Sequence, residues 1–248
     1  MRSLAFSISL PIPPVTRLKQ PIEGLLLDTC NVLYDATGWR RWLLQVLRRF
    51  GLHSHYRSLF HVWEKDYLRP VFRGQCDFCH ALRTFLQALG LSPGQIEEVA
   101  AACQTRRIRW EADTRLLPGV KSTLRRLSSA GIPLAIVSNS EYPGHVLRER
   151  LERMGLQDML TAVVSSRDLG RIKPDPICYQ TALKALNVPA DLAAFVGDDP
   201  DELAGARRLG LQTIAFNPTY EPDSDITLTR FADLLELVDL PISQNRAG

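Results

Sequence analysis

The chain has 248 residues, of which 45% are hydrophobic and 23% are charged, and its formal net charge at pH 7 is +3. This composition is typical of a globular protein with a sizeable core, and the length allows one large domain or a core with a smaller insert. The small net charge argues against nucleic acid or an anionic membrane as the main partner. No apolar stretch approaches the ~20 residues that cross a bilayer, so we predict no membrane partner. The five cysteines are odd in number and irregularly spaced, which predicts a reducing, cytoplasmic compartment.

The first predicted strand lies within residues 22–27, a short apolar run typical of a buried strand in a parallel sheet. Residues 1–19 before it contain three prolines that interrupt any apolar region, so we expect a flexible lead-in rather than a signal peptide. The strand ends at Asp28. Open α/β sheets bind ligands at the carboxyl ends of their strands, so this acid is a candidate nucleophile or metal ligand. On its own, Asp28 could equally cap the turn that follows.

Residues 36–112 have a helical period and no strand pattern. We expect four helices there, over about residues 42–50, 59–63 and 78–89 and from residue 92 onward. Because this block follows the first strand directly, we expect it to lie over the carboxyl edge of the sheet as a helical cap. A lid that covers a ligand crevice would occupy this position. The residues of the cap that could face the crevice are Trp39, Arg40, Arg41, Tyr67 and Arg73, and the sequence does not choose among them.

From residue 113 to residue 240, short apolar strands alternate with amphipathic helices. The strands are expected at 133–137, 161–164, 193–196 and 212–216. This alternation is the signature of an α/β fold with a doubly wound parallel sheet. The predicted organisation is therefore a core of residues 20–35 and 113–240, an inserted cap of residues 36–112, and a loose tail of residues 241–248.

Polar side chains stand at the far ends of the first four predicted strands. They are Asp28, the pair Ser138 and Asn139, the pair Ser165 and Ser166, and the pair Asp198 and Asp199, and Lys173 follows the strand at 161–164. Single residues of this kind are common in turns, but two acids, a hydroxyl and a lysine at one sheet edge point to a site. The acids could share Mg²⁺, and Lys173 with Ser138 could hold an anionic group.

At these residues the chain resembles the haloacid dehalogenase (HAD) superfamily of hydrolases, the type with a helical cap inserted after motif one. The resemblance covers about residues 21–218 and carries four motifs in the order of the family. They read Asp28-Thr-Cys-Asn-Val-Leu-Tyr-Asp35, Ile136-Val-Ser-Asn-Ser140, Lys173-Pro-Asp-Pro176 and Val196-Gly-Asp-Asp-Pro-Asp-Glu202. The resemblance implies a Rossmann-like core and a phosphatase that acts on a small phosphorylated metabolite.

The resemblance also assigns roles to the residues of the motifs. Asp28 would be the nucleophile that forms an aspartyl-phosphate. Ser138 would hydrogen-bond a phosphate oxygen, Asn139 would help to arrange the site, and Lys173 would neutralise the charge of nucleophile and phosphate. Mg²⁺ would be held by Asp28, the backbone carbonyl of Cys30 and Asp198, with Asp199 as a direct or more distant partner.

Two positions depart from the pattern of the family. Cys30 stands where family phosphatases carry a second aspartate, which protonates the leaving oxygen and then activates water. A thiol with a pKa near ~8.5 is a poor acid and base for this task, so a phosphatase built this way should be slow. In motif four the later acid of the family lies one residue further from the glycine than Glu202 does, so either Glu202 or Asp201 could support the metal.

Three functions therefore stay open from the sequence. The first is a Mg²⁺-dependent phosphatase, slowed by Cys30. The second is a catalytically impaired descendant that keeps the anion site and binds a phosphorylated ligand or a partner protein. The third is hydrolysis of a carbon–halogen or carbon–phosphorus bond, because superfamily members with these activities also lack the second aspartate. Neither the substrate nor the oligomeric state can be read from the sequence.

Overall fold

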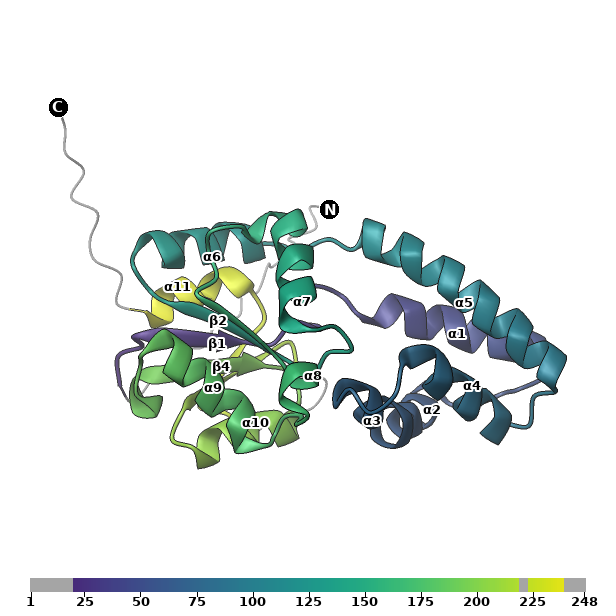
Figure 1. The fold of residues 1–248 in the computed structure, drawn as a ribbon. Coiled ribbons are helices and arrows are strands. Elements are labelled where there is room, and N and C mark those ends of the chain that lie inside the picture. Colours follow the sequence, from purple (N-terminus) through teal and green to yellow (C-terminus); the bar gives the residue numbers. More distant parts are fainter. Residues whose placement is uncertain (1–19, 219–222, 239–248) are drawn as a thin grey trace, which may run out of the picture.

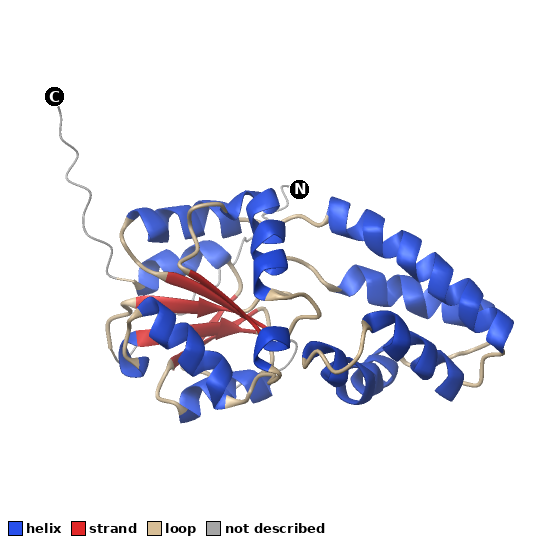
Figure 2. Cartoon of the chain, viewed as in Figure 1, coloured by secondary structure: helices blue, strands red, loops and turns tan. Residues whose placement is uncertain are grey.

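The computed structural model describes residues 20–218 and 223–238, so the predicted lead-in and tail lie outside the described residues. Its centre is a six-stranded parallel sheet with the order β3-β2-β1-β4-β5-β6 (Figure 2). The strands are β1 (Gly24–Leu27), β2 (Leu134–Ser138), β3 (Ala162–Ser165), β4 (Ala193–Gly197), β5 (Gln212–Phe216) and β6 (Ile226–Leu228). The predicted doubly wound parallel sheet is confirmed. From β1 the chain first adds β2 and β3 on one side and then β4, β5 and β6 on the other. The strand order therefore reverses beside β1, and such sheets have a ligand-binding crevice at this position.

Successive side chains of the buried strands point to opposite faces of the sheet, and both faces are covered. On one face Leu25 and Leu27 pack with the helices α6 (Val120–Ser129), α7 (Gly144–Leu151) and α11 (Leu234–Leu237). On the other face Leu26 and Phe195 pack with α9 (Pro176–Leu186) and α10 (Pro200–Arg208). Figure 1 shows these helices on the two sides of the sheet. Double burial explains why the central strands β1, β2 and β4 are largely apolar instead of alternating apolar and polar residues.

The inserted segment folds into helices only and has its own hydrophobic cluster around the fully buried Trp63 and Phe85. Its helices are α1 (Thr37–Arg49), α2 (Tyr56–Val62), α3 (Arg69–Phe72), α4 (Phe78–Ala88) and α5 (Pro93–Asp113), with a π-helical stretch over Trp63–Leu68. We call α1 to α5 the cap. The cap lies next to the sheet edge that the carboxyl ends of the strands form (Figures 1 and 2).

The chain enters and leaves the cap at one place. Tyr34 and Leu116 form an antiparallel bridge, and the Leu117 amide donates a 2.7 Å hydrogen bond to the Leu33 carbonyl. A second link lies further along the edge, where the hydroxyl of Ser166, the first residue of α8 (Ser166–Leu169), donates to the Phe72 carbonyl at 2.7 Å. The two crossings of the chain are therefore held side by side.

All five cysteines are free thiols. Within the part of the chain that the structure describes, no helix has both the length and the apolar character that a membrane crossing needs.

Candidate active site

The ends of the three central strands bring Asp28, Ser138 and Asp198 to the same edge of the sheet. In the parallel register Leu27 of β1 pairs with Ile136 of β2 and with Val196 of β4. The Asp28 amide continues this ladder with a 3.0 Å hydrogen bond to the Val196 carbonyl. Strand pairing thus fixes the position of the Asp28 backbone.

A buried charge cluster surrounds Asp28. The Lys173 ammonium lies 2.8 Å from Asp28 Oδ1 and 2.6 Å from Glu202 Oε2, and its side chain is 1% exposed. Burial alone would lower the pKa of Lys173, but the carboxylates of Asp28 and Glu202 raise it above its ordinary value. Burial also raises the pKa of Glu202 well above its usual range, although Lys173 opposes this. Lys173 therefore stays cationic and contacts two acidic side chains that are each only 11% exposed.

Only one of the two carboxylate oxygens of Asp28 is engaged. Oδ1 accepts a 2.7 Å hydrogen bond from the Thr29 amide in addition to its contact with Lys173. Among the described residues none donates a hydrogen bond to Oδ2. Two donors thus fix the orientation of the carboxylate and leave Oδ2 free to react.

Ser138 and Asn139 differ in what their side chains contact. The Ser138 hydroxyl shares a 2.7 Å hydrogen bond with the hydroxyl of Thr29, a fully buried residue that the sequence analysis did not single out. Asn139 Oδ1 accepts from the Lys173 amide at 2.8 Å, and its Nδ2 donates to Glu202 Oε1 at 2.9 Å. Asn139 therefore orients Lys173 and Glu202, while Ser138 lies on the Asp28 side of the site.

Of the two acids that the spacing of motif four left open, Glu202 is the one that contacts the charge cluster around Lys173. It is buried in the first turn of α10 and contacts Lys173, whereas Asp201 is exposed. Asp199 is exposed as well, and its carboxylate caps α10 by accepting hydrogen bonds from the amides of Asp201 and Glu202 at 2.8 and 3.1 Å. Of the acids in this segment, Asp198 and Glu202 face the site.

The residues around Asp198 match the ligand preferences of Mg²⁺. Burial and then the nearby Asp28 carboxylate raise the pKa of Asp198 to about 6, so two acids face each other where a cation would relieve their repulsion. One Asp198 oxygen accepts a 2.9 Å hydrogen bond from Asn31. No described residue donates to the Cys30 carbonyl oxygen. Two carboxylates and a free carbonyl are the hard oxygen ligands that Mg²⁺ prefers.

The Cys30 thiol is protonated at neutral pH. Burial and then the Asp28 carboxylate raise its pKa to about 11. The thiol lines the crevice, but it cannot supply a base near neutral pH, because its pKa lies far above the operating range of a general base.

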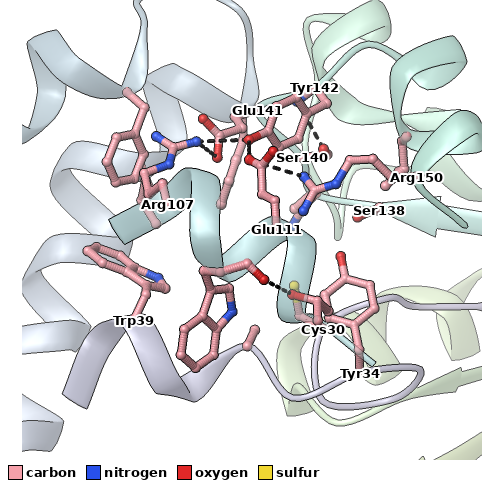
Figure 3. Close-up of a pocket in the computed structure, with 18 of the residues that line it drawn as sticks. Cys30, Tyr34, Trp39, Arg107, Glu111, Ser138, Ser140, Glu141, Tyr142 and Arg150 are labelled. Atoms are coloured by element: carbon pink, nitrogen blue, oxygen red, sulfur yellow. Dashed lines mark hydrogen bonds and ion pairs between the residues drawn. The ribbon is translucent and has the colours of Figure 1, made fainter. Parts of the chain in front are cut away.

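A pocket of about 160 Å³ opens between the edge of the sheet and the cap. Core residues Cys30, Ser138 and Asn139 line one side of it. Of the five cap residues considered from the sequence, Trp39 and Arg40 line it, whereas Arg41, Tyr67 and Arg73 do not. Figure 3 shows further charged and aromatic residues there that the sequence did not single out, namely Arg107, Glu111, Glu141, Tyr142 and Arg150.

Comparisons with known proteins identify the family of the chain. A family model described as haloacid dehalogenase-like hydrolase matches residues 55–216, more than half of the chain. The chain therefore belongs to the haloacid dehalogenase-like hydrolases, which are enzymes, as its motifs predicted. The match begins after Asp28 and Cys30, so the family assignment does not depend on the first motif.

Two relatives and one solved structure are similar over different shares of the chain. A ribulose-1,5-bisphosphate 5-phosphatase of Halopiger xanaduensis is 34% identical over 127 residues, which are 50% of this chain and 52% of that protein. A phosphoglycolate phosphatase of Pectobacterium atrosepticum is 27% identical over 166 residues, or 61% of this chain and 70% of that protein. The crystal structure of a dehalogenase superposes with a TM-score of 0.65 and 23% identity, over 89% of this chain and 99% of that chain, which shows a shared fold. This chain thus spans about half the length of the first relative.

Proposed function

We propose that the protein is a Mg²⁺-dependent phosphatase that hydrolyses a small phosphate monoester through an aspartyl-phosphate on Asp28. The observation that carries the proposal is the Asp28 carboxylate, held at Oδ1 by Lys173 and the Thr29 amide with Oδ2 unengaged. The two phosphatase relatives support it, because their names specify phosphorylated small molecules as substrates.

In the proposed first step Asp28 Oδ2 attacks phosphorus, and the bond between phosphorus and the leaving oxygen breaks. The leaving group departs as an alcohol after taking up a proton. Water then cleaves the aspartyl-phosphate, which releases inorganic phosphate and restores the Asp28 carboxylate. Lys173 offsets the negative charge that accumulates on the carboxylate and the phosphoryl oxygens, and Ser138 donates a hydrogen bond to a phosphoryl oxygen.

We assign the metal to Asp28, the Cys30 carbonyl and Asp198. When bound there, Mg²⁺ would reduce the repulsion between the anionic nucleophile and the anionic substrate. Asp199 is left out of this assignment because its carboxylate caps α10. Asn31 holds Asp198 in place from the loop that follows β1.

The test is hydrolysis of a panel of phosphate monoesters, with 2-phosphoglycolate, ribulose 1,5-bisphosphate and p-nitrophenyl phosphate, in Mg²⁺ and in excess chelator. We expect turnover in Mg²⁺ that chelator removes. Asp28→Asn should lower turnover by about 10³-fold or more. Asp201→Asn is the matched control, because Asp201 is an exposed acid beside the site, and we expect full activity. Folded wild-type protein that turns over no ester of the panel would contradict the proposal.

A second candidate is binding of a phosphorylated ligand without turnover. It is favoured by Cys30, whose thiol cannot replace the acid and base of the missing carboxylate. The panel distinguishes the two, because steady turnover by the wild-type protein excludes a purely binding role. Hydrolysis of carbon–halogen bonds is less well supported, since Asp198 faces Asp28 in a manner that suits a metal. Halide release from 2-haloacids in the presence of excess chelator would favour this reaction.

A cytoplasmic location stays a prediction.

A further inference from the structure

Three arginines line the pocket, and two of them are already paired with carboxylates at short distance. Arg40 Nη2 lies 2.5 Å from Glu64 Oε1. Arg107 Nη2 lies 2.6 Å from Glu141 Oε1 and donates a 2.9 Å hydrogen bond to the Tyr142 hydroxyl. Each of these two guanidinium groups therefore already holds a carboxylate at short distance, although Nε of Arg40 is buried without a hydrogen-bond partner among the described residues.

Arg150 is different. Its nearest carboxylate oxygen, on Glu111, is 3.9 Å away, which is beyond hydrogen-bond distance. Within residues 20–218 and 223–238 no acceptor takes a hydrogen bond from its guanidinium, although the side chain is only 14% exposed. The group extends from α7 toward Glu111 at the side of the pocket (Figure 3). A largely buried guanidinium is stabilised when its N–H donors find acceptors, so Arg150 has the capacity to bind an anionic group that enters the pocket.

The ring of Tyr142 orients this group. The Arg150 guanidinium carbon lies 4.4 Å from the centre of the ring. Stacking on an aromatic face leaves the edge of the guanidinium available, and that edge matches the two oxygens of a carboxylate or phosphate. The Tyr142 hydroxyl is itself held by Arg107 and Glu111, so the stacking surface is fixed.

We propose that Arg150 binds a second anionic group, a carboxylate or a second phosphate, on the leaving group of the substrate. This inference rests on the proposed phosphatase function for the placement of the first phosphate at Asp28. It narrows the substrate class to small molecules that carry a phosphate monoester and another anion, separated by the width of the pocket. Arg150 is a specificity-determining residue in this assignment.

The experiment measures binding, so that it does not depend on turnover. Asp28→Asn, which lacks the nucleophile, is titrated calorimetrically in Mg²⁺ with two matched pairs of probes. Ethyl phosphate and 2-phosphoglycolate differ by a carboxylate, and ribulose 5-phosphate and ribulose 1,5-bisphosphate differ by a phosphate. We expect the doubly anionic member of at least one pair to bind about tenfold tighter or more. The pair that shows the preference identifies the second anion.

Arg150→Gln in the same background should abolish that preference and leave the affinity for the singly anionic probes unchanged. Arg150→Lys should retain part of it, because the charge remains without the fork of donors. Arg153→Gln is the matched control: it removes the same charge nearby in sequence, but its side chain is 67% exposed and does not line the pocket. It should keep the full preference.

Glu111→Gln separates anion binding from a role of Arg150 in holding the cap. It removes the same ion pair between cap and core but leaves Arg150 in place. If Arg150 binds the second anion, this variant keeps or increases the preference for doubly anionic probes. Three results would each overturn the proposal. The two probes of each pair could bind with equal affinity, or the preference for the doubly anionic probe could survive in Arg150→Gln. Glu111→Gln could also lose this preference as completely as Arg150→Gln does. Failure of the phosphatase proposal would show separately, as absence of turnover in the wild-type panel.

Discussion

Cys30 decides how fast the proposed reaction can finish. Because its pKa of about 11 keeps the thiol protonated at neutral pH, no base stands at the position two residues after Asp28. Cys30→Asp would place a carboxyl there, next to Asp28 and Asp198, whose charges would raise its pKa toward the range of a useful acid and base. We expect turnover in Mg²⁺ to rise by about 10²-fold, measured as kcat on the best ester of the panel.

Cys30→Ser is the control for this change. A hydroxyl is no better a base than the protonated thiol, so the rate should stay within about threefold of wild type, since no acid–base group is gained or lost. A Cys30→Asp variant no faster than Cys30→Ser would show that another residue already supplies the proton transfer.

Lys173 links catalysis to stability. Its removal would leave the side chains of Asp28 and Glu202, each only 11% exposed, facing each other without their cation. Breaking a buried ion pair from one side typically costs about 3–5 kcal/mol. We therefore expect Lys173→Met to lower the free energy of unfolding by about that amount in urea titrations. Lys184→Met, at an exposed position of α9, should change it little, and equal effects of the two substitutions would refute the argument.

At the scale of elements, the contact between α1 and α5 depends on a glycine. A Cβ at Gly38 would lie 1.5 Å from Cη2 of Trp110, a rigid ring that cannot move aside cheaply. Gly38→Ala should therefore destabilise the protein by about 1–3 kcal/mol through overpacking. Gly94→Ala, near the start of α5, meets nothing within 4 Å and is the control. Thermal unfolding of both variants tests this, and a neutral Gly38→Ala would disprove the packing argument.

The elements that the sequence predicted best were those whose burial leaves a simple pattern. The five longer strands are mostly apolar because both faces of the sheet are covered, and their positions were predicted to within about two residues. The strand β6 was missed because Ile226–Leu228 is too short to form a pattern of its own. The helix α1 begins at Thr37, before the predicted segment of residues 42–50, since its first turn is rich in polar residues, whereas α5 begins at Pro93 as expected.

The site was predicted unevenly for a related reason. Asp28, Ser138, Lys173 and Asp198 could be assigned because each follows a strand or belongs to a motif. The burial of Glu202 and the exposure of Asp201 depend on the rotation of α10, which the spacing alone does not determine. Arg150 and Tyr142 belong to no motif, although Tyr142 follows Ser140 by two residues, and their meeting with Glu111 of the cap is a tertiary contact without a local signal.

At the scale of the whole molecule, buried thiols in both the cap and the core make its stability depend on pH. Burial raises the pKa of Cys103 in the cap and of Cys178 in the core to about 11. In the unfolded chain a thiol ionises near ~8.5, so between that pH and about 11 the native state binds more protons. Stability should therefore fall as the pH rises above about 8.5, by about 2 kcal/mol per thiol between pH 8 and pH 10.

Urea titrations at pH 7, 8, 9 and 10 measure this decline. The double variant Cys103→Ala and Cys178→Ala should show a shallower one, although it is less stable at pH 7 because two buried side chains have been shortened. A decline of the same steepness in both proteins would assign the alkaline sensitivity to other groups, such as the buried phenol of Tyr179, whose pKa is also raised.

The bridge between Tyr34 and Leu116 has a consequence for how such a protein can change over evolutionary time. The cap starts and stops at neighbouring points of the core, so the core already brings together the ends of whatever is inserted there. Inserts of very different length then cost nearly the same entropy, since each doubling of a flexible loop adds only about 0.6 kcal/mol. Exchanging the insert would replace the pocket wall made by Trp39 and Arg107 without moving Asp28. The core, which carries the residues proposed for catalysis, and the cap, which forms much of the pocket wall, can therefore diverge in sequence at different rates.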